Sequence, residues 1–315
     1  MSDLCLVTGG AGFIGSHLVD GLVKKGYAVR VLDNFSTGLH DNLKHHGSRI
    51  ELIEGSITNP ADVASAVRGV QKIVHLGALA SVARSVEEPL ISHAACATGT
   101  ITVLDEARKA GVKRVVYAAS SSAYGGYSLP DGQKEDLLPN AFSPYAAAKL
   151  AGEYYMQAFA ATYGIETVRL RFFNIFGPRQ RADSPYSGVI ALFIAAMQKG
   201  NAPTVHGDGL QSRDFTYVAN CVQAIIKASE APNVSGKVYN VGTGSSVTVL
   251  QLIESLNKLM GLQLQAKHAD PRAGDVRYSQ ADISRTRKDV GYEPEVRFED
   301  GLAKTLAWYR GEKWE

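Results

Sequence analysis

A glycine-rich turn, Thr8-Gly-Gly-Ala-Gly-Phe-Ile-Gly15, separates a short apolar run from a helical stretch near the start of the chain. Its glycines fit two dinucleotide-binding spacings: Gly10, Gly12 and Gly15, or Gly9, Gly12 and Gly15. Side chains must be absent where such a turn tightens, where the backbone approaches a pyrophosphate, and where the helix meets the strand. The start of the helix then offers amide donors to phosphate groups. The turn therefore predicts a strand–turn–helix unit that binds a dinucleotide; the alternative is a tight turn without a ligand.

Short apolar runs alternate with amphipathic stretches through the first half of the chain. The runs expected to form buried parallel strands are Leu4–Thr8, Ala28–Asp33, Ile50–Glu54, Lys72–Leu76, Arg114–Ala118 and Glu166–Arg171. The stretches expected to form helices are Gly15–Lys25, Ala61–Val67, Leu90–Ala110 and Pro144–Tyr163. This alternation predicts an α/β fold with a Rossmann-type doubly wound parallel sheet.

The pattern changes after Phe173, where the polar, proline-containing segment Pro178–Pro185 is followed by short elements. We expect residues 1–176 to form the cofactor-binding domain, joined by a returning segment at about 214–245 that contains the apolar run Val238–Val241. Residues 177–213 and 246–315 are expected to form a smaller mixed α/β substrate-binding domain, which ends in the helical stretch Phe298–Arg310 and covers the carboxyl edge of the sheet.

Asp33 ends the second predicted strand, 18 residues after Gly15. An acid at that place can accept hydrogen bonds from both hydroxyls of an adenosine ribose, and it repels a 2′-phosphate. The predicted cofactor is therefore NAD rather than NADP. The alternative is that Asp33 is a surface turn residue of the segment Asp33–Gly38.

Tyr145 and Lys149 stand four residues apart in a predicted helix, so they lie on one face of it. An ammonium group beside a phenol stabilises the phenolate and lowers its pKa from the ordinary value of about 10. Such a phenol can exchange protons near neutral pH, as an enzyme that oxidises hydroxyl groups requires. On its own, the same spacing also occurs in exposed amphipathic helices.

Composition excludes several classes of function. The net charge of +2 gives no reason to expect nucleic acid or a membrane surface as a partner. No apolar stretch approaches the ~20 residues of a membrane span. Cys5, Cys96 and Cys221 form neither a disulfide framework nor a zinc spacing, so we expect a cytoplasmic protein. The histidines show no ligand spacing, and His45-His46 falls in a polar stretch that predicts a solvated loop, so no metal site is expected.

Further segments complete the pattern: His75–Ala78, Ser120–Ser122 with Tyr124-Gly125, Arg171–Gln180, Gly207–Phe215, Asn240–Gly244 and Pro271–Ser279. Together with the glycine turn, Asp33-Asn34 and the Tyr145/Lys149 pair, they resemble the extended short-chain dehydrogenase/reductase family, and specifically its nucleotide-sugar 4-epimerases. The resemblance covers nearly the whole chain.

The resemblance implies that Ser120, Tyr145 and Lys149 are catalytic. Ser120 would hydrogen-bond the sugar O4, Tyr145 would act as general base, and Lys149 would hold the nicotinamide ribose and lower the pKa of Tyr145. The residues implied to bind NAD, which would be held tightly and regenerated in each cycle, are Gly9, Gly12, Phe13, Ile14, Asp33, Asn34, Phe35, Ser36, Thr37, Gly38, Ser56, Ile57, Leu76, Gly77, Ala78, Ala80, Tyr145, Lys149 and Phe172.

The residues implied to bind a UDP-sugar are Ser81, Ser120, Ser121, Ser122, Tyr145, Asn174, Val189, Thr204, Val205, His206, Gln211, Arg213, Arg272, Asp275 and Ser279. A guanidinium suits a diphosphate, although a single arginine is more often a solvated surface charge. Two positions depart from the family's pattern. Ser56 replaces a frequent aspartate near the adenine, and Cys96 replaces a frequent asparagine and is expected only to pack within its helix.

Within the family, dehydratases carry an Asp-Glu pair after the catalytic threonine, and decarboxylases commonly carry a glutamate in the same stretch. Ser121 and Ser122 hold those places here, so the expected reaction is inversion at C4 of a UDP-hexose through a transient 4-keto intermediate. Ser279 matches a position where a bulky tyrosine excludes an N-acetyl group. The expected substrates are therefore UDP-GlcNAc and UDP-GalNAc, with UDP-glucose and UDP-galactose also accepted.

Two alternatives stay open. A UDP-glucuronate 4-epimerase or decarboxylase is less favoured, because the sequence shows no dedicated extra cation for a carboxylate. A non-enzymatic NAD-binding scaffold or sensor on the same fold would usually lack the tyrosine or the lysine. The resemblance also implies a homodimer through a four-helix bundle, formed by the helices near residues 90–110 and 144–163.

Overall fold

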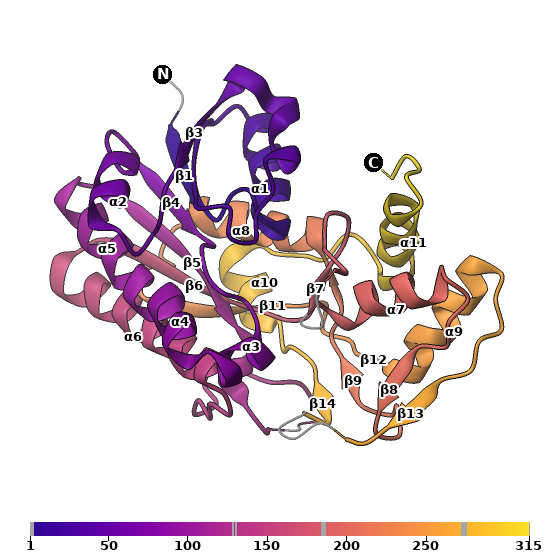
Figure 1. Cartoon of the computed structure of the whole chain (residues 1–315). Coiled ribbons are helices and arrows are strands. Elements are labelled where there is room, and N and C mark those ends of the chain that lie inside the picture. Colours follow the sequence, from indigo (N-terminus) through magenta and orange to yellow (C-terminus); the bar gives the residue numbers. More distant parts are fainter. Residues whose placement is uncertain (1–2, 128, 130, 184–186, 272–275, 315) are drawn as a thin grey trace.

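The fold was obtained as a computed structural model, which describes residues 3–127, 129, 131–183, 187–271 and 276–314. Seven parallel strands form its main sheet in the order β11-β6-β5-β4-β1-β2-β3. Their bounds are β1 Leu4–Thr8, β2 Ala28–Asp33, β3 Ile50–Glu54, β4 Lys72–His75, β5 Arg114–Ser120, β6 Glu166–Phe172 and β11 Lys237–Val241. The predicted Rossmann-type doubly wound sheet is confirmed (Figure 1).

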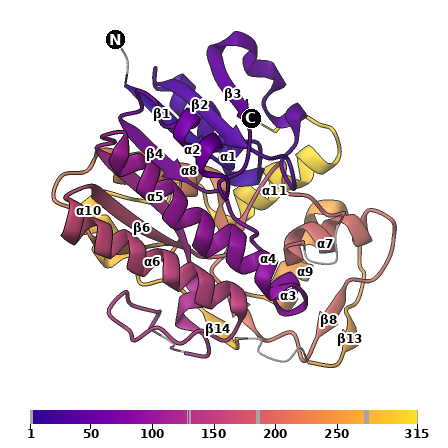
Figure 2. The same cartoon turned by 60° about the vertical axis from the view of Figure 1, so that its left-hand side comes forward.

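Helices cover both faces of this sheet. One face packs against α1 Phe13–Lys24, α8 Val218–Glu230 and α10 Ser284–Val290. The other face packs against α2 Pro60–Ala66, α5 Gly99–Lys109 and α6 Pro144–Tyr163, and Figure 2 shows α5 and α6 side by side across it. Alternate residues of β1 serve the two cores, since Cys5 and Val7 lie on the α1 side and Leu6 on the α5 side. A strand buried on both faces is apolar throughout, which is why the sequence shows it so clearly. In the described part of the chain, no helix is both long and apolar enough to cross a membrane.

The helix α6 has the predicted bounds, and its ends explain the agreement. Ser143 caps it by accepting a hydrogen bond from the Ala146 amide, and Pro144 occupies the first turn. Gly164 ends it in the left-handed conformation with φ 69°. These signals fix the helical register of Tyr145 and Lys149.

The helix predicted over Leu90–Ala110 is confirmed as a continuous helical run from Pro89 to Lys109, but it contains a π-helical turn that the sequence did not predict. The chain forms α3 Val82–Glu87, α4 Pro89–His93, a π-helical turn (η3) at Ala94–Thr98, and then α5. Cys96 in this turn is fully buried and shares a small apolar cluster with Ala148 and Tyr145 of α6. Cys96 therefore packs between two helices and not only within its own.

The prediction of a solvated loop at His45-His46 is wrong for His46. The segment forms two short 3₁₀ helices, η1 His40–Asn42 and η2 Lys44–Arg49, and His46 is only 5% exposed. It is buried because η2 packs against Asp20 of α1. The polar sequence did not reveal this contact, since Asp20 lies 26 residues away.

The second half of the chain builds a separate core from α7, α9 and α11, to the right in Figure 1. The elements of this half are β7 Ile175–Phe176, α7 Val189–Met197, β8 Thr204–His206, β9 Ser212–Arg213, β10 Thr216–Tyr217, β12 Val247–Thr248, α9 Val249–Met260, β13 Lys267–Ala269, β14 Tyr278–Ser279 and α11 Phe298–Tyr309. In the first half, the 3₁₀ turn η4 Ser121–Tyr124 directly follows β5. The chain returns to the main sheet through α8 and β11, and α10 packs beside them. The division into two domains stays a prediction.

Candidate active site

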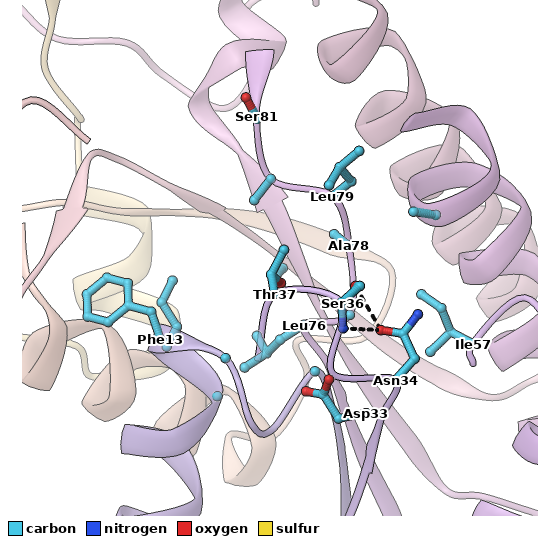
Figure 3. Close-up of a pocket in the computed structure, with 18 of the residues that line it drawn as sticks. Phe13, Asp33, Asn34, Ser36, Thr37, Ile57, Leu76, Ala78, Leu79 and Ser81 are labelled. Atoms are coloured by element: carbon cyan, nitrogen blue, oxygen red, sulfur yellow. Dashed lines mark hydrogen bonds between the residues drawn. The ribbon is translucent and has the colours of Figure 1, made fainter. Parts of the chain in front are cut away.

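A cavity of about 980 Å³ opens at the carboxyl ends of β1, β2, β4, β5 and β6. In a doubly wound sheet, ligands bind at this edge. Figure 3 shows Asp33 at the end of β2, and Asn34 and Ser36 from the loop that follows, around the same space as Leu76 and Ser81. The main sheet therefore places the predicted cofactor loop and the segment after β4 in one cavity.

The glycine turn at this edge has no room for side chains. Gly9 has φ +71°, and a Cβ there would lie 2.8 Å from the Gly77 amide nitrogen. A Cβ on Gly15 would lie 2.1 Å from the Gly9 carbonyl oxygen. The first turn of α1 lines the cavity and has no side-chain cap, so its amide groups are available to a phosphate. The turn fits a dinucleotide pyrophosphate.

Asp33 lies at the end of β2 and lines the cavity, with 8% of its surface exposed. Its Oδ2 accepts a hydrogen bond from the Ala11 amide at 2.9 Å, and its Oδ1 accepts one from the Phe35 amide at 2.9 Å. These two bonds hold the carboxylate at the predicted ribose position. A second negative group such as a 2′-phosphate would be repelled there, so the residues fit NAD.

The other predicted cofactor residues also line the cavity, with two exceptions. Phe35 has φ 54° and stacks on His40, with ring centroids 3.6 Å apart. Gly38 packs against Ala11. Phe35 and Gly38 do not line the cavity, and their roles in NAD binding stay predictions.

His75 links the elements that lie beneath this cavity. Its Nδ1 lies 2.7 Å from the Thr8 hydroxyl, and its Nε2 lies 3.1 Å from the Thr100 hydroxyl. Burial lowers the pKa of His75 to about 3, so the ring stays neutral at neutral pH. It joins β4 to β1 and α5 without lining the cavity.

Ser120, Tyr145 and Lys149 meet at one wall of the cavity, as predicted from their positions in the sequence. Ser120 ends β5, and Tyr145 and Lys149 come from the first turns of α6. The Ser120 hydroxyl accepts hydrogen bonds from the Ser122 amide at 3.2 Å and the Ser122 hydroxyl at 2.9 Å. A serine, a phenol and an ammonium group therefore share one small region.

The expected lowering of the Tyr145 pKa by Lys149 is wrong for this structure. Burial raises the pKa of Tyr145, and its hydrogen bond with Ser120 only partly opposes that effect. The Lys149 ammonium donates instead to the Ala118 carbonyl at 2.9 Å and lies over the Tyr117 ring at 4.9 Å. Burial also lowers the pKa of Lys149. Helical spacing brings the two residues to one wall, but burial decides their pKa values.

The predicted substrate residues divide into two groups. Ser81, Ser120, Tyr145 and Asn174 line the cavity. Those that do not line it are Ser121, Ser122, Val189, Thr204, Val205, His206, Gln211, Arg213 and Ser279. Arg272 and Asp275 lie outside the described residues. The roles of both groups stay predictions.

The residues of the second half are nevertheless brought near one another. Ser279 of β14 pairs in register with Arg213 of β9. The Gln211 side chain donates to the His206 carbonyl at 2.8 Å. Short strand pairings between distant segments therefore gather the expected uridine, diphosphate and sugar positions.

Three arginines that line the cavity were missed by the sequence reasoning. Arg84 pairs with Glu88 at 2.5 Å, Arg179 pairs with Asp20 at 2.8 Å, and Arg181 pairs with Asp183. The sequence did offer a signal for Arg84. It stands one helical turn after Ser81, which caps α3 and was itself predicted to bind the substrate. Arg179 and Arg181 belong to the polar, proline-containing segment that begins at Pro178; Arg179 also lies in the segment Arg171–Gln180 that carries the resemblance, but neither residue was assigned a role.

The sequence matches the profile of the NAD dependent epimerase/dehydratase family over residues 5–242. It is 35% identical over 309 residues to a UDP-glucose 4-epimerase of Mycolicibacterium smegmatis, an alignment that covers 97% of this chain and 98% of that protein. It is similar to the crystal structure of a Thermotoga maritima UDP-glucose 4-epimerase with UDP-glucose (TM-score 0.93, 36% identity, covering 98% of this chain and 99% of that one).

It is equally similar to a UDP-N-acetylglucosamine 4-epimerase of Methanobrevibacter ruminantium M1 in complex with UDP-N-acetylmuramic acid (TM-score 0.93, 36% identity, covering 99% of both chains). The two structures differ in the sugar that their names give, although both match nearly the whole chain.

Proposed function

This chain belongs to the NAD-dependent epimerase/dehydratase family, and on that basis we propose that it inverts C4 of a UDP-hexose through a transient 4-keto sugar. The observation that carries this proposal is the meeting of Ser120, Tyr145 and Lys149 in the cavity that also contains the glycine turn and Asp33. The expected dinucleotide site and the group that would transfer the proton therefore lie in one cavity, where both could act on the same substrate.

The chain's own residues would divide the work. Gly9, Gly12 and Asp33 would hold NAD, which accepts the C4 hydride and returns it when bound. Tyr145 would remove the O4 proton, directly or through Ser120, and would later return it; because burial raises its pKa, the phenolate must be stabilised when cofactor and substrate bind. Lys149 would hold the nicotinamide ribose. Inversion requires the keto sugar to turn over while its diphosphate stays anchored, so binding at the diphosphate must be firmer than at the sugar.

The surroundings of Ser120 favour epimerisation over dehydration or decarboxylation. Ser121 and Ser122 begin the turn η4, and Ser122 donates its hydroxyl to Ser120. Among the described lining residues the carboxylates are Asp33, at the expected ribose position, and Asp183, which is paired with Arg181. Elimination at C5 needs an acid/base group beside the sugar, and serine hydroxyls do not supply one.

For the sugar itself, we propose UDP-GlcNAc and UDP-GalNAc, with UDP-glucose and UDP-galactose also accepted. Ser279 supports this preference, because its register places it next to Arg213, the expected diphosphate contact. Serine leaves room for an N-acetyl group where a tyrosine would fill the space.

The change Ser279→Tyr is expected to remove turnover of the N-acetylated sugars and to keep turnover of UDP-glucose. The reason is steric: the phenol would occupy the space of the C2 substituent. The kcat/KM ratio for UDP-GlcNAc and UDP-glucose measures the effect. An unchanged ratio in this variant would show that Ser279 does not determine which sugar is accepted.

A second candidate is UDP-glucuronate 4-epimerase, and one observation favours it. Arg84 and Arg181 line the cavity and could be shared with a substrate carboxylate, although each already pairs with an acid. The test is a panel of UDP-GlcNAc, UDP-glucose and UDP-glucuronate, incubated separately with the purified protein and analysed for the C4 epimers. Conversion of the uronate alone would replace the first proposal, and a NAD-bound protein inert toward all three would favour a scaffold or sensor.

We also propose a homodimer in which two helices of each copy, the continuous run α4–η3–α5 and α6, form a four-helix bundle. Apolar side chains are exposed on α4 and α6 and on the adjacent α3, namely Leu90 at 83%, Ile91 at 51%, Tyr154 at 59% and Val86 at 65%. A cluster of this kind is typical of a surface that is covered by a partner.

The dimer proposal predicts that Leu90→Asp shifts the protein to monomer, measured by sedimentation velocity. Leu52→Asp is the matched control, because Leu52 is also exposed, at 41%, but lies on β3 at the opposite edge of the sheet. A wild-type monomer, or an equal response of both variants, would contradict the proposed interface.

A cytoplasmic location is the last part of the proposal. Cys5, Cys96 and Cys221 are free and buried thiols, as expected where disulfides do not form. Recovery of the native protein from an extracellular fraction would argue against this location.

A further inference from the structure

A cluster of metal-ligating side chains lies outside the cavity, between α1 and η2. His45 and His46 both point Nε2 at the same oxygen of Asp20, Oδ1, each at 2.8 Å. The three potential ligand atoms lie within 4.8 Å of one another. None of the three residues lines the cavity of the candidate active site.

These atoms match the donors that a zinc-like ion prefers. Two imidazole nitrogens and a carboxylate oxygen form a common three-residue zinc set, with ligand distances of about 2.0–2.2 Å. Tetrahedral ligands at that distance lie about 3.3 Å apart. The two Nε2–Oδ1 separations of 2.8 Å would have to lengthen slightly, and the three ligand atoms, which lie within 4.8 Å of one another, would have to turn toward a common point.

The surroundings provide both rigidity and access. The side chain of His46 is 3% exposed and fixes one ligand, whereas the side chains of His45 at 45% and Asp20 at 31% leave the site open to an arriving ion and to a water ligand. The second Asp20 oxygen, Oδ2, accepts a hydrogen bond from Arg179 at 2.8 Å. Such an outer hydrogen bond orients a ligating carboxylate and leaves its other oxygen free for a metal.

From this geometry we propose that Asp20, His45 and His46 form a binding site for one divalent transition-metal ion of the zinc class. The ion would join α1 to η2 through Oδ1 and the two Nε2 atoms, with each histidine moving its proton to Nδ1. The positive charge of Arg179 opposes the ion, so we expect moderate affinity. The chemistry at C4 does not involve this site.

The proposed metal site also lies close to the cavity of the candidate active site. Arg179, which holds Asp20, lines that cavity and lies over the Trp314 ring at 5.7 Å. A bound ion would therefore lie one carboxylate away from a wall of the cavity, where it would help to fix the loop after β7.

Titration of the purified, tag-free protein with Co²⁺ and Zn²⁺ tests the proposal. We expect one Co²⁺ per chain with the visible absorption of a tetrahedral nitrogen/oxygen site, displaced by Zn²⁺. Zn²⁺ should also raise Tm, because it binds the folded chain. His45→Ala, at an exposed position, should weaken binding by at least about tenfold, because removal of even an outer-sphere partner costs 10–100-fold.

The matched control is His40→Ala, which removes an exposed histidine of the neighbouring turn and should leave binding unchanged. His46→Ala checks the buried ligand, and its unmetallated Tm reports whether it still folds. Absence of stoichiometric binding to the wild type, or equal binding by wild type and His45→Ala, would overturn the proposed site.

Discussion

Replacing Tyr145 with phenylalanine is expected to lower kcat for C4 epimerisation by about 100-fold or more, the usual contribution of a general base. The phenol meets Ser120 at one wall of the cavity, and phenylalanine keeps its ring while removing the group that transfers the proton. NAD and UDP-sugar binding should change little, because most predicted binding residues are other than Tyr145 and lose nothing in this variant. Steady-state kinetics, with ligand binding measured separately by calorimetry, separates the two effects.

Tyr163→Phe is the control for this change. Tyr163 is 53% exposed at the far end of the same helix, so loss of its hydroxyl should leave kcat unaltered. Equal rates for Tyr145→Phe and wild type would remove Tyr145 from the catalytic role.

The largest effect on stability is expected from Glu153→Ala. Glu153 on α6 and Arg171 on β6 form a two-point ion pair with both distances at 2.9 Å, and each side chain is 3% exposed. Burial lowers the pKa of Arg171, but its bonds to Glu153 outweigh this and raise it, so the pair stays charged. Removing one partner leaves a buried charge unpaired and should cost about 3–5 kcal/mol of unfolding free energy. Urea unfolding at a fixed NAD concentration measures it.

The chain contains a matched control for this pair. Arg287 and Glu293 form the same two-point geometry at 2.8 and 2.7 Å, but their side chains are 49% and 60% exposed. Glu293→Ala should change stability far less than Glu153→Ala, because solvent screens an exposed pair. Similar losses in both variants would show that burial does not determine the strength of the Glu153–Arg171 interaction.

Features with local causes were predictable from the sequence. β2, β3 and α6 have the predicted bounds, because apolar runs and helix-capping residues are written into neighbouring positions. The glycine turn and Asp33 were found for the same reason, since strand, turn and helix follow one another directly.

Features that depend on distant contacts were not predictable. The π-helical turn at Ala94–Thr98 packs against α6, the burial of His46 depends on Asp20, and the raised pKa of Tyr145 comes from its surroundings. Arg179 and Arg181 were missed because a loop position gives no periodic signal. In each case, the cause is a residue far away in the sequence.

The central claim is that hydride leaves C4 and returns to the same carbon on its other face. Its most direct test uses UDP-GlcNAc and UDP-glucose carrying deuterium at C4, with the products resolved by NMR. The account predicts the C4 epimer with deuterium retained at C4 and no net consumption of NAD. An epimer that carries solvent hydrogen at C4, or no epimer from either sugar, would contradict it.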